Sequence, residues 1–417
     1  MKVLWITNII FPEALGKLSG DTEFKSSGGW MLGLADAIVS TGKVELIVAS
    51  VSPVVVNLTK LIGKNITYYV LPLGKGNTKE NQEYRHFWKQ IYNEVKPEIV
   101  HIHGTECSHG LAYMHEIGVD NVVVSIQGLL SSCAEYYRAG LSLYDIYSNL
   151  TPRDILKGSI LADQRKFKER SIYESKILNS AKYFIGRTSW DREISTTINP
   201  TAQYFFCNEI LRDEFYCDDI WKYENCSQFT IFISQAGYPL KGFHQVLKAM
   251  PMILSKFPKT TIRVAGPNIT KCESLNDFIH FTGYGRYLKR LLKKLELEQK
   301  VVFLGSLSGL EMKQEYLNCN IFVCPSSIEN SPNSLAEAQI LGVPCLASSV
   351  GGIPDMMKGN ESTLYRFEEV EILAEKIVSV FSSINYVSTL RDSALKRHDR
   401  TTNCLNLLSI YRYIIEA

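Results

Sequence analysis

The sequence has no long hydrophobic run and no marked excess of either charge. No apolar run reaches the roughly 20 residues of a membrane-spanning helix, because Ser50 and Pro53 interrupt the longest candidate, residues 44–56. The formal net charge of +2 excludes bulk nucleic-acid binding, which normally requires a large basic excess. The first residues, Met1–Thr7, read as a buried strand and lack the pattern of a cleavable signal.

Cysteine pairs in a metal-binding spacing are also lacking. Ten cysteines occur, but none forms a Cys-x-x-Cys pair and no regular disulfide framework is present. Cys324 and Cys345 fall within apolar segments that read as core strands. These features predict free buried thiols in a reducing compartment, and hence a cytoplasmic protein.

What the chain does have is enough apolar sequence for two cores. Its 417 residues, 45% hydrophobic and 21% charged, predict globular domains of about 200 residues each. Apolar strand-like runs alternate with helical patterns from end to end, which predicts an α/β fold with doubly wound parallel sheets. The expected strands are Val3–Asn8, Val44–Ser50, Thr67–Leu73, Ile99–His103, Val122–Ile126, Tyr183–Gly186, Thr230–Ser234, Thr261–Ala265, Val301–Leu304, Ile321–Cys324 and Pro344–Ala347.

The predicted boundary between the two halves falls at Leu211–Ser227, where charges are mixed and no clean periodicity is present. The expected parts are residues 1–210, residues 211–385 and a C-terminal segment, residues 386–417. From Thr389 this segment reads as one long helix. Its expected packing residues are Leu405, Leu408, Ile410 and Tyr413.

Two carboxylates, Glu329 and Glu337, are separated by seven residues at a junction that reads as strand, loop and helix. Ser331 is a suitable N-cap and Pro332 a suitable first helical residue. A helix N-terminus at this place favours an anion such as a diphosphate. The expected free amides belong to Asn333, Ser334 and Leu335. The alternative interpretation is a surface loop with two solvated carboxylates.

This block resembles the Glu-x7-Glu signature of retaining GT-B glycosyltransferases of group 1 (family 4-like), and the following Val350–Pro354 strengthens the resemblance. The resemblance implies two facing Rossmann-like domains, the second binding a nucleotide sugar and the first presenting an acceptor hydroxyl. It also implies a C-terminal helix that crosses back onto the first domain. The implied roles are ribose binding by Glu337, sugar binding by Glu329, and diphosphate binding by the amides of Asn333, Ser334 and Leu335.

Lys241 and Gly242 follow the first strand of the second half. They resemble the family's phosphate loop, in which the lysine approaches the donor diphosphate and the glycine permits a close backbone approach. The family usually has an arginine five residues before this lysine, and here Ala236 stands there. The alternative is a solvated lysine at a helix start.

Three features of the first half resemble the family's acceptor side. Gly28 and Gly29 begin a helix after the first strand, although a glycine pair also marks ordinary turns. His101 and His103 share one strand face, as a structural or acceptor-side pair, or as a metal pair without a third ligand. Gln127 occupies the place where the family usually has a histidine, and its amide can hydrogen-bond a sugar hydroxyl but cannot act as a base.

No Asp-x-Asp triplet occurs, so the resemblance implies transfer without a metal or other cofactor. Lys241 and the helix amides would then stabilise the departing diphosphate. The donor phosphate oxygen is thought to serve as the base in this family, so the change at Gln127 need not abolish activity.

The segment from Thr151 to Ala181 reads as one long polar helix with a basic excess, and Leu129–Tyr147 before it is rich in leucine and tyrosine. Together they could face an acidic, lipid-linked acceptor at the inner membrane surface, or the helix could simply be solvated. The basic run at Arg286–Lys294 is interpreted as a solvent face.

The expected function is transfer of a hexose-type sugar from a nucleoside-diphosphate sugar to a glycan or lipid-linked acceptor, in surface polysaccharide biosynthesis. Two rival interpretations stay open. One is a nucleotide-sugar-binding protein that has lost activity, suggested by Gln127 and Ala236. The other is an epimerase or a phosphorylase on the same scaffold, because fold alone does not set function.

Overall fold

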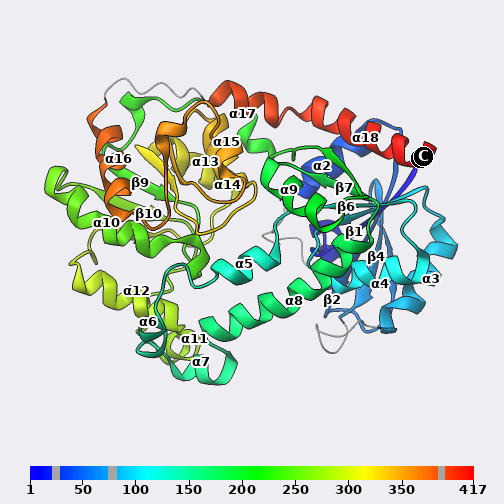
Figure 1. Ribbon diagram of the computed structural model, residues 1–417, viewed down its shortest axis with the longest axis horizontal. Coiled ribbons are helices and arrows are strands. Elements are labelled where there is room, and N and C mark those ends of the chain that lie inside the picture. The colour runs from blue at the N-terminus through cyan, green and yellow to red at the C-terminus, as the bar shows by residue number, and fades with distance from the viewer. Residues whose placement is uncertain (21–28, 74–81, 384–389) are drawn as a thin grey trace. The chain divides into compact units, whose positions relative to one another are not determined.

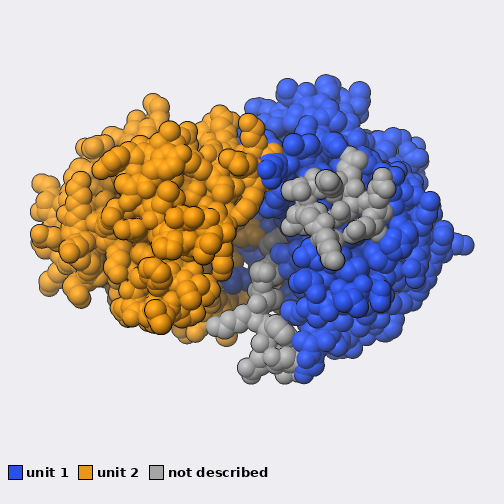
Figure 2. Space-filling model, turned by 90° about the horizontal axis from the view of Figure 1, so that it is seen from below, with its two compact units in different colours: residues 1–131, 169–212, 397–417 blue, residues 132–168, 213–396 orange. Residues whose placement is uncertain are grey.

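The computed structural model describes residues 1–20, 29–73, 82–383 and 390–417, which fall into two compact units (Figures 1 and 2). Unit 1 consists of Met1–Ser131, Glu169–Arg212 and Arg397–Ala417. Unit 2 consists of Ser132–Lys168 and Asp213–Lys396. The segment 132–168 therefore packs with the second unit, although it precedes the boundary expected near residue 211.

Unit 1 is built on an eight-stranded sheet with the order β3-β4-β2-β1-β5-β6-β7-β8. All neighbours pair in parallel except β3 with β4. The central strands are buried along their length, as expected for a parallel sheet with apolar runs. The strands are β1 (Lys2–Thr7), β2 (Glu45–Ser52), β3 (Thr59–Ile62), β4 (Ile66–Pro72), β5 (Ile99–His103), β6 (Val122–Ser125), β7 (Tyr183–Gly186) and β8 (Gln203–Phe206).

The helices of unit 1 are α1 (Pro12–Ser19), α2 (Gly29–Ser40), α3 (Gln82–Val95), α4 (Ser108–Ile117), α9 (Ser189–Ile198) and α18 (Arg400–Glu416). The C-terminal helix α18 packs against α2 and β5. Its Tyr411 hydroxyl lies 2.9 Å from Nε1 of Trp5 and 2.6 Å from Nδ1 of His101, deep in this core.

Unit 2 is built on a six-stranded parallel sheet with the order β11-β10-β9-β12-β13-β14. Numbered along this unit, the order is 3-2-1-4-5-6, the Rossmann arrangement. The strands are β9 (Thr230–Ile233), β10 (Thr261–Val264), β11 (Val301–Phe303), β12 (Ile321–Cys324), β13 (Cys345–Ser348) and β14 (Leu364–Tyr365).

The α-helices of unit 2 are α6 (Leu143–Tyr147), α7 (Pro152–Lys157), α10 (Phe243–Lys256), α11 (Leu275–His280), α12 (Gly283–Lys294), α13 (Gly309–Asn318), α14 (Asn333–Ile340), α15 (Ile353–Met356) and α16 (Val370–Ser382). Its 3-10 helices are η1 (Asp213–Phe215), η2 (Tyr223–Asn225), η3 (Pro239–Lys241) and η4 (Glu361–Thr363). The helices that run from one unit into the other are α5 (Leu130–Tyr136), α8 (Ile160–Ser180) and α17 (Arg391–Arg397).

Two helices expected to be continuous are broken. The polar helix expected after Thr151 divides into α7 and α8, because Gly158 adopts a positive φ of 102° between them. The C-terminal helix divides into α17 and α18, and Asp399 caps the second part by accepting from the amide of Thr402. Of the expected packing residues, Leu408 and Ile410 are buried, but Leu405 and Tyr413 are exposed because they lie on the outer face of α18.

Candidate functional site in unit 2

The carboxyl ends of β9 and β12 are adjacent in the sheet of unit 2, although the two strands lie far apart in the sequence.

 The topological switch point of the sheet lies between these two strands, because the connections from β9 and β12 leave in opposite directions. Lys241 lies in the connection after β9, and Glu329 lies in the connection after β12. Ligands of open α/β sheets bind at such a point.

The structure brings Lys241 and Glu329 together. The Nζ atom of Lys241 lies 2.6 Å from Oε1 of Glu329, and the hydroxyl of Ser326 donates to the same oxygen at 2.9 Å. Burial alone would lower the pKa of Lys241, but the carboxylate of Glu329 outweighs it, and the pKa lies above its ordinary value. Lys241 therefore remains a cation at neutral pH, and a cation is what the binding of an anion requires.

Two glycines fix the loops that carry this ion pair. Gly242 has a φ of 67°, and a Cβ atom there would lie 1.7 Å from the carbonyl oxygen of Pro325. Gly351 has a φ of 53°, and a Cβ atom there would lie 1.9 Å from the carbonyl oxygen of Glu329. The close approach that Gly242 permits in the structure is thus to a neighbouring loop.

Helix α14 begins one residue later than expected. Pro332 is its N-cap and Asn333 its first residue, and no side-chain cap hydrogen bond is formed, so Ser331 is not the cap. The amide of Leu335 donates to the carbonyl of Pro332 at 3.0 Å and is not free, contrary to expectation, because the first turn closes on Pro332. Within the described part of the chain, the amides of Asn333 and Ser334 have no hydrogen-bond acceptor.

Glu337 lies one turn into α14 and is 4% exposed. Its Oε2 atom is 3.4 Å from the hydroxyl of Tyr316, which also donates to the carbonyl of Ser334 at 2.9 Å. Tyr316 therefore fixes both the start of α14 and the carboxylate behind it. This residue was not recognised in the sequence, because it belongs to α13 and no local pattern links it to α14.

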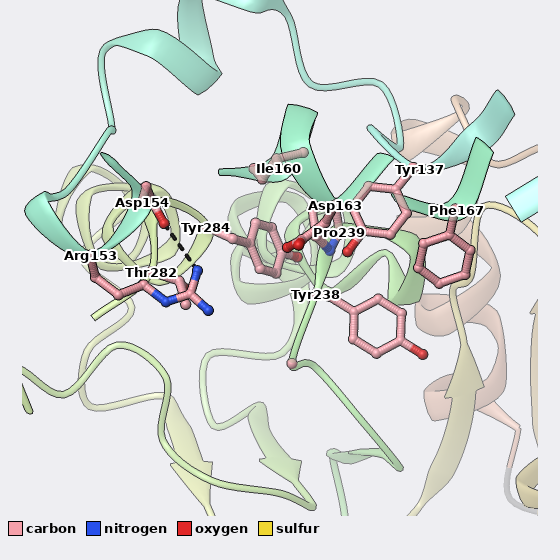
Figure 3. A pocket seen from close by; sticks show the side chains of 12 residues that line it. Tyr137, Arg153, Asp154, Ile160, Asp163, Phe167, Tyr238, Pro239, Thr282 and Tyr284 are labelled. Atoms are coloured by element: carbon pink, nitrogen blue, oxygen red, sulfur yellow. Dashed lines mark hydrogen bonds and ion pairs between the residues drawn. The ribbon is translucent and has the colours of Figure 1, made fainter. Parts of the chain in front are cut away.

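A pocket with a volume of 420 Å³ lies within unit 2 (Figure 3). Its lining comes from the segment 132–168, from the loop before Lys241 and from the start of α12. Figure 3 shows the rings of Tyr137, Phe167 and Tyr238 gathered at one end, with Arg153 and Asp154 at the other. The centroids of Tyr137 and Phe167 are 5.1 Å apart.

The charged side chains that line the pocket are paired with side chains of opposite charge. Arg153 donates to Asp154 at 3.4 Å, and Lys166 donates to Asp163 at 2.8 Å. Burial raises the pKa of Tyr137, so its hydroxyl remains protonated at neutral pH. Such a pocket offers hydroxyl and carboxylate groups to a neutral ligand, and aromatic rings to the apolar faces of that ligand.

Tyr238 connects this pocket to the ion pair. Its side chain lines the pocket, and the centre of its ring lies 5.8 Å from Nζ of Lys241. A cation over a tyrosine ring is an attractive arrangement, so Tyr238 also helps to place the lysine. The only feature of the sequence that indicated this role is the position of Tyr238 three residues before Lys241.

The residues expected on the acceptor side belong to unit 1. Gly28 lies outside the described residues, and Gly29 is the first residue of α2. His101 and His103 do share a strand face, because their rings stack with centroids 3.8 Å apart. Gln127 follows β6 and is partly buried.

The two histidines are buried and uncharged. Burial lowers the pKa of His101 to about 3 and holds the pKa of His103 well below its ordinary value. Both ring nitrogens of His101 are engaged, with the hydroxyls of Tyr411 and Ser125, each at 2.6 Å. This arrangement favours a structural role for His101.

Glu106 is a candidate residue that the sequence analysis did not single out. It follows β5, and its carboxylate accepts a short hydrogen bond from the side-chain amide of Asn8, which follows β1. The strands β1 and β5 flank the switch point of unit 1, so this pair lies where a ligand of that sheet would bind. Burial raises the pKa of Glu106. The signal that could have found it is an acidic residue just beyond a switch-point strand.

Across residues 1–20, 29–73, 82–383 and 390–417, no three His, Cys, Asp or Glu side chains gather as a metal site would require. In the same ranges, none of the helices has the length and apolarity needed to cross a membrane. The ten cysteines are free, and Cys324 and Cys345 are buried as expected.

Known proteins resemble this chain in its fold and in the sequence of unit 2. The family model described as glycosyl transferases group 1 matches residues 222–397. The chain is 14% identical to sucrose-phosphate synthase from Thermosynechococcus elongatus, with a TM-score of 0.69 and full coverage of both chains. It is 14% identical to HepE of Anabaena, solved in complex with UDP-glucose, with a TM-score of 0.64 over 99% of this chain and 100% of that chain.

Among curated relatives, the putative colanic acid biosynthesis glycosyltransferase WcaL of Salmonella typhimurium is 23% identical over 272 residues, 60% of this chain and 65% of that protein. The matched segments span between 20% and 65% of the lengths of the curated relatives. The chain has the GT-B fold, and its residues 222–397 match the family model of the glycosyl transferases group 1.

Proposed function

We propose that this protein transfers a hexose-type sugar from a nucleoside-diphosphate sugar to a hydroxyl group of a glycan or lipid-linked acceptor, with retention of anomeric configuration. The observation that supports it most is the Lys241–Glu329 ion pair at the switch point of unit 2, in the residues that match the family model. A cation and a carboxylate meet there beside the carboxyl ends of the strands, where a phosphorylated sugar has partners for both of its parts.

On the donor side, Glu337 accepts hydrogen bonds from the ribose hydroxyls. The amides of Asn333 and Ser334, together with Lys241, bind the diphosphate. Leu335 is left out of this set, because its amide already donates to the carbonyl of Pro332. Glu329 contacts the transferred sugar, and its negative charge favours the oxocarbenium-like state at the anomeric carbon.

The reaction breaks the bond between the anomeric carbon and the diphosphate oxygen and forms a bond from that carbon to the acceptor oxygen. The acceptor proton moves to the departing diphosphate. Lys241 and the helix amides stabilise the charge of the leaving group, so we propose that no metal is needed. Gln127, His103 and the glycine pair Gly28 and Gly29 are proposed for the acceptor side, where Gln127 can orient a hydroxyl but cannot remove its proton.

The pocket beside Tyr238 supports a glycan acceptor. Its 420 Å³ falls at the small end of the roughly 300–1,000 Å³ range of small-molecule sites, which suits one or two sugar rings. Sugars carry hydroxyls on their edges and C–H groups on their faces, and the pocket offers polar and aromatic partners for each. Its compensated charges fit a neutral ligand better than a phosphate.

Two findings on similar proteins guide the choice of substrates. HepE was solved with UDP-glucose, and WcaL is named for colanic acid biosynthesis. We therefore propose a UDP-sugar as the first donor to test and a role in surface polysaccharide biosynthesis. The proposed location is the cytoplasm, with peripheral association at the inner face of the membrane.

The donor assignment is tested by titrating UDP, GDP and ADP into the protein in a calorimeter. Glu337→Gln should weaken binding of the preferred nucleotide by tenfold or more, about 1.4 kcal/mol, because a charged acceptor of the ribose hydroxyls is lost. Glu371→Gln, at an exposed position of α16, is the matched control and should bind as the unchanged protein does. Equal affinity in the Glu337 variant would remove the ribose assignment.

The transfer itself is tested by incubation with the preferred sugar nucleotide. Slow release of free sugar, unaffected by EDTA and abolished in Lys241→Met, is the expected result. Tight nucleotide binding without any release or transfer would instead favour a binding protein that has lost activity, the rival that Gln127 and Ala236 suggest.

A further inference from the structure

Unit 2 exposes an unusual number of large apolar side chains on three short helices. Tyr144 on α6, Ile155 and Leu156 on α7, and Leu275 on α11 are between 78% and 85% exposed. Further exposed members on the same helices are Leu143, Tyr147, Phe278 and Ile279. We call this set of eight side chains the apolar surface. Single exposed apolar residues are ordinary, but a group of this kind marks an interaction site.

The three helices lie together. Helix α11 contacts α7, and α6 contacts α12. Figure 1 shows α6, α7 and α11 grouped at the lower left, below α12. Each of the three short helices starts with a capping box, so backbone amides at its N-terminus already have hydrogen-bond acceptors within the chain.

Helix α12 adds a basic face beside the apolar surface. Arg286, Lys289, Arg290 and Lys293 occupy positions i, i+3, i+4 and i+7, which lie on one side of a helix. That side faces the α6–α7 connection, because Arg286 donates to the carbonyl of Leu150 at 2.8 Å and Arg290 to the carbonyl of Ser148 at 2.8 Å. It also reaches the end of α11, because Nζ of Lys289 lies 5.9 Å from the ring centre of Phe281.

Nearby acidic groups offset this charge only in part. Asp145, Asp154 and Asp277 are held in the capping boxes of α6, α7 and α11. Glu273 pairs with Lys271 at 3.7 Å. Lys289, Arg290 and Lys293 are exposed, so the surface next to the apolar side chains is positively charged.

We infer that α6, α7, α11 and α12 dock onto a bilayer surface that contains anionic lipids. The apolar surface would enter the boundary between headgroups and acyl chains, while the basic face of α12 meets the acidic headgroups. A protein partner fits less well, because the cores of protein interfaces are depleted in lysine. The inference does not depend on the proposed transfer reaction, and it names the surface and the lipid class of the peripheral association.

The test is co-sedimentation of the full chain with vesicles of phosphatidylcholine, with or without phosphatidylglycerol, and without any sugar nucleotide. The expected result is binding to the anionic vesicles that weakens as salt is raised, because the charge attraction is screened. Replacing Ile155, Leu156 and Leu275 together by serine should lower the partition coefficient at least tenfold. Lys289→Gln with Lys293→Gln should lower it on anionic vesicles and leave weak binding to neutral vesicles unchanged.

The control variant carries Val54→Ser and Val56→Ser, two exposed apolar positions of unit 1 that should not affect vesicle binding. All variants change exposed side chains, so their thermal unfolding should match that of the unchanged protein, which separates loss of binding from loss of fold. Failure of the unchanged protein to bind anionic vesicles, or equal binding by the triple serine variant, would overturn the inference. Because no donor is present, either result stands apart from the fate of the proposed glycosyl transfer.

Discussion

At the scale of single residues, the ion pair of unit 2 depends on neighbours that have no charge. Gly242 brings the loop after β9 against the carbonyl of Pro325, and the amide of Ser327 donates to the carbonyl of Leu240 at 2.8 Å. These contacts join the loop of Lys241 to the loop of Glu329. The pairing of the two charges therefore follows from backbone geometry as much as from attraction between the side chains.

Replacing Gly242 by alanine should disturb this junction. The positive φ disfavours any other residue by roughly 1–2 kcal/mol, and the clash with Pro325 adds to that cost. We expect the free energy of unfolding of unit 2 to fall by about 2–4 kcal/mol. Urea unfolding would measure it, and nucleotide titration should show weaker binding because Lys241 is displaced.

Gly237→Ala is the matched control, because a Cβ atom there meets nothing within 4 Å. It should leave the unfolding free energy unchanged or raise it slightly by restricting the unfolded chain. Equal stability of the alanine variants at positions 242 and 237 would show that the contact with Pro325 does not constrain the loop.

The sequence predicted Lys241, Glu329 and Glu337 as site residues because each stands next to a strand end or a helix start. It could not predict that Lys241 and Glu329 pair, because they lie far apart in the chain and only the strand order brings them together. Tyr316 was missed for the same reason. Its importance comes from contacts with a distant element, to which a local pattern gives no access.

At the scale of elements, the start of α5 is held by a carboxylate from another helix. Glu174 on α8 is 1% exposed and accepts from the amides of Leu130 at 2.6 Å and Ser131 at 3.0 Å. It also accepts from the hydroxyl of Thr105 at 3.1 Å. The free amides of a helix N-terminus are thereby satisfied by a negative charge, which the helix dipole favours.

Glu174→Gln should cost about 1.5–3 kcal/mol of the free energy of unfolding, because it removes a charged acceptor from several buried donors. Urea unfolding monitored by tryptophan fluorescence would measure the loss. The control is Glu169→Gln on the same helix, where the side chain is exposed and no comparable change is expected. A Glu174 variant as stable as the Glu169 variant would contradict the role given to this carboxylate.

All eleven expected strands are present, with boundaries that differ by no more than two residues, because long apolar runs between polar turns are a strong signal. The strands β3, β8 and β14 were missed. They are short strands at sheet edges, and their apolar and polar residues do not alternate clearly. The break between α7 and α8 was not predicted, because a single glycine such as Gly158 does not by itself end a helical pattern.

At the scale of the whole molecule, both units are built on largely parallel sheets, but they differ in their buried histidines. Burial lowers the pKa of His101 to about 3, of His109 to about 4 and of His398 to about 4, all in unit 1. The pKa of His103 in the same unit is also well below its ordinary value. In unit 2, burial lowers the pKa of His244 to about 4.

These shifts predict that acid destabilises unit 1 more than unit 2. Between pH 6.5 and about 4 the unfolded chain binds protons at these histidines while the folded chain does not, so the free energy of unfolding falls as the pH falls. Lowering the pH from 7 to 5 should cost about 2 kcal/mol for each such histidine. Hydrogen exchange at the two pH values, corrected for intrinsic rates and followed by mass spectrometry, would report each unit separately.

The contribution of a single histidine can be isolated in unit 2, which holds His244 between the hydroxyl of Tyr284 at 3.1 Å and the carbonyl of Ala139 at 2.9 Å. His244→Gln keeps a polar side chain but removes the titrating group, so the stability of unit 2 should depend less on pH by about 2 kcal/mol over the same interval. His280→Gln, at an exposed position of α11, should leave the pH dependence unchanged. Equal acid sensitivity of the two variants would mean that His244 is protonated in the folded unit, and the buried, neutral state assigned to it would be wrong.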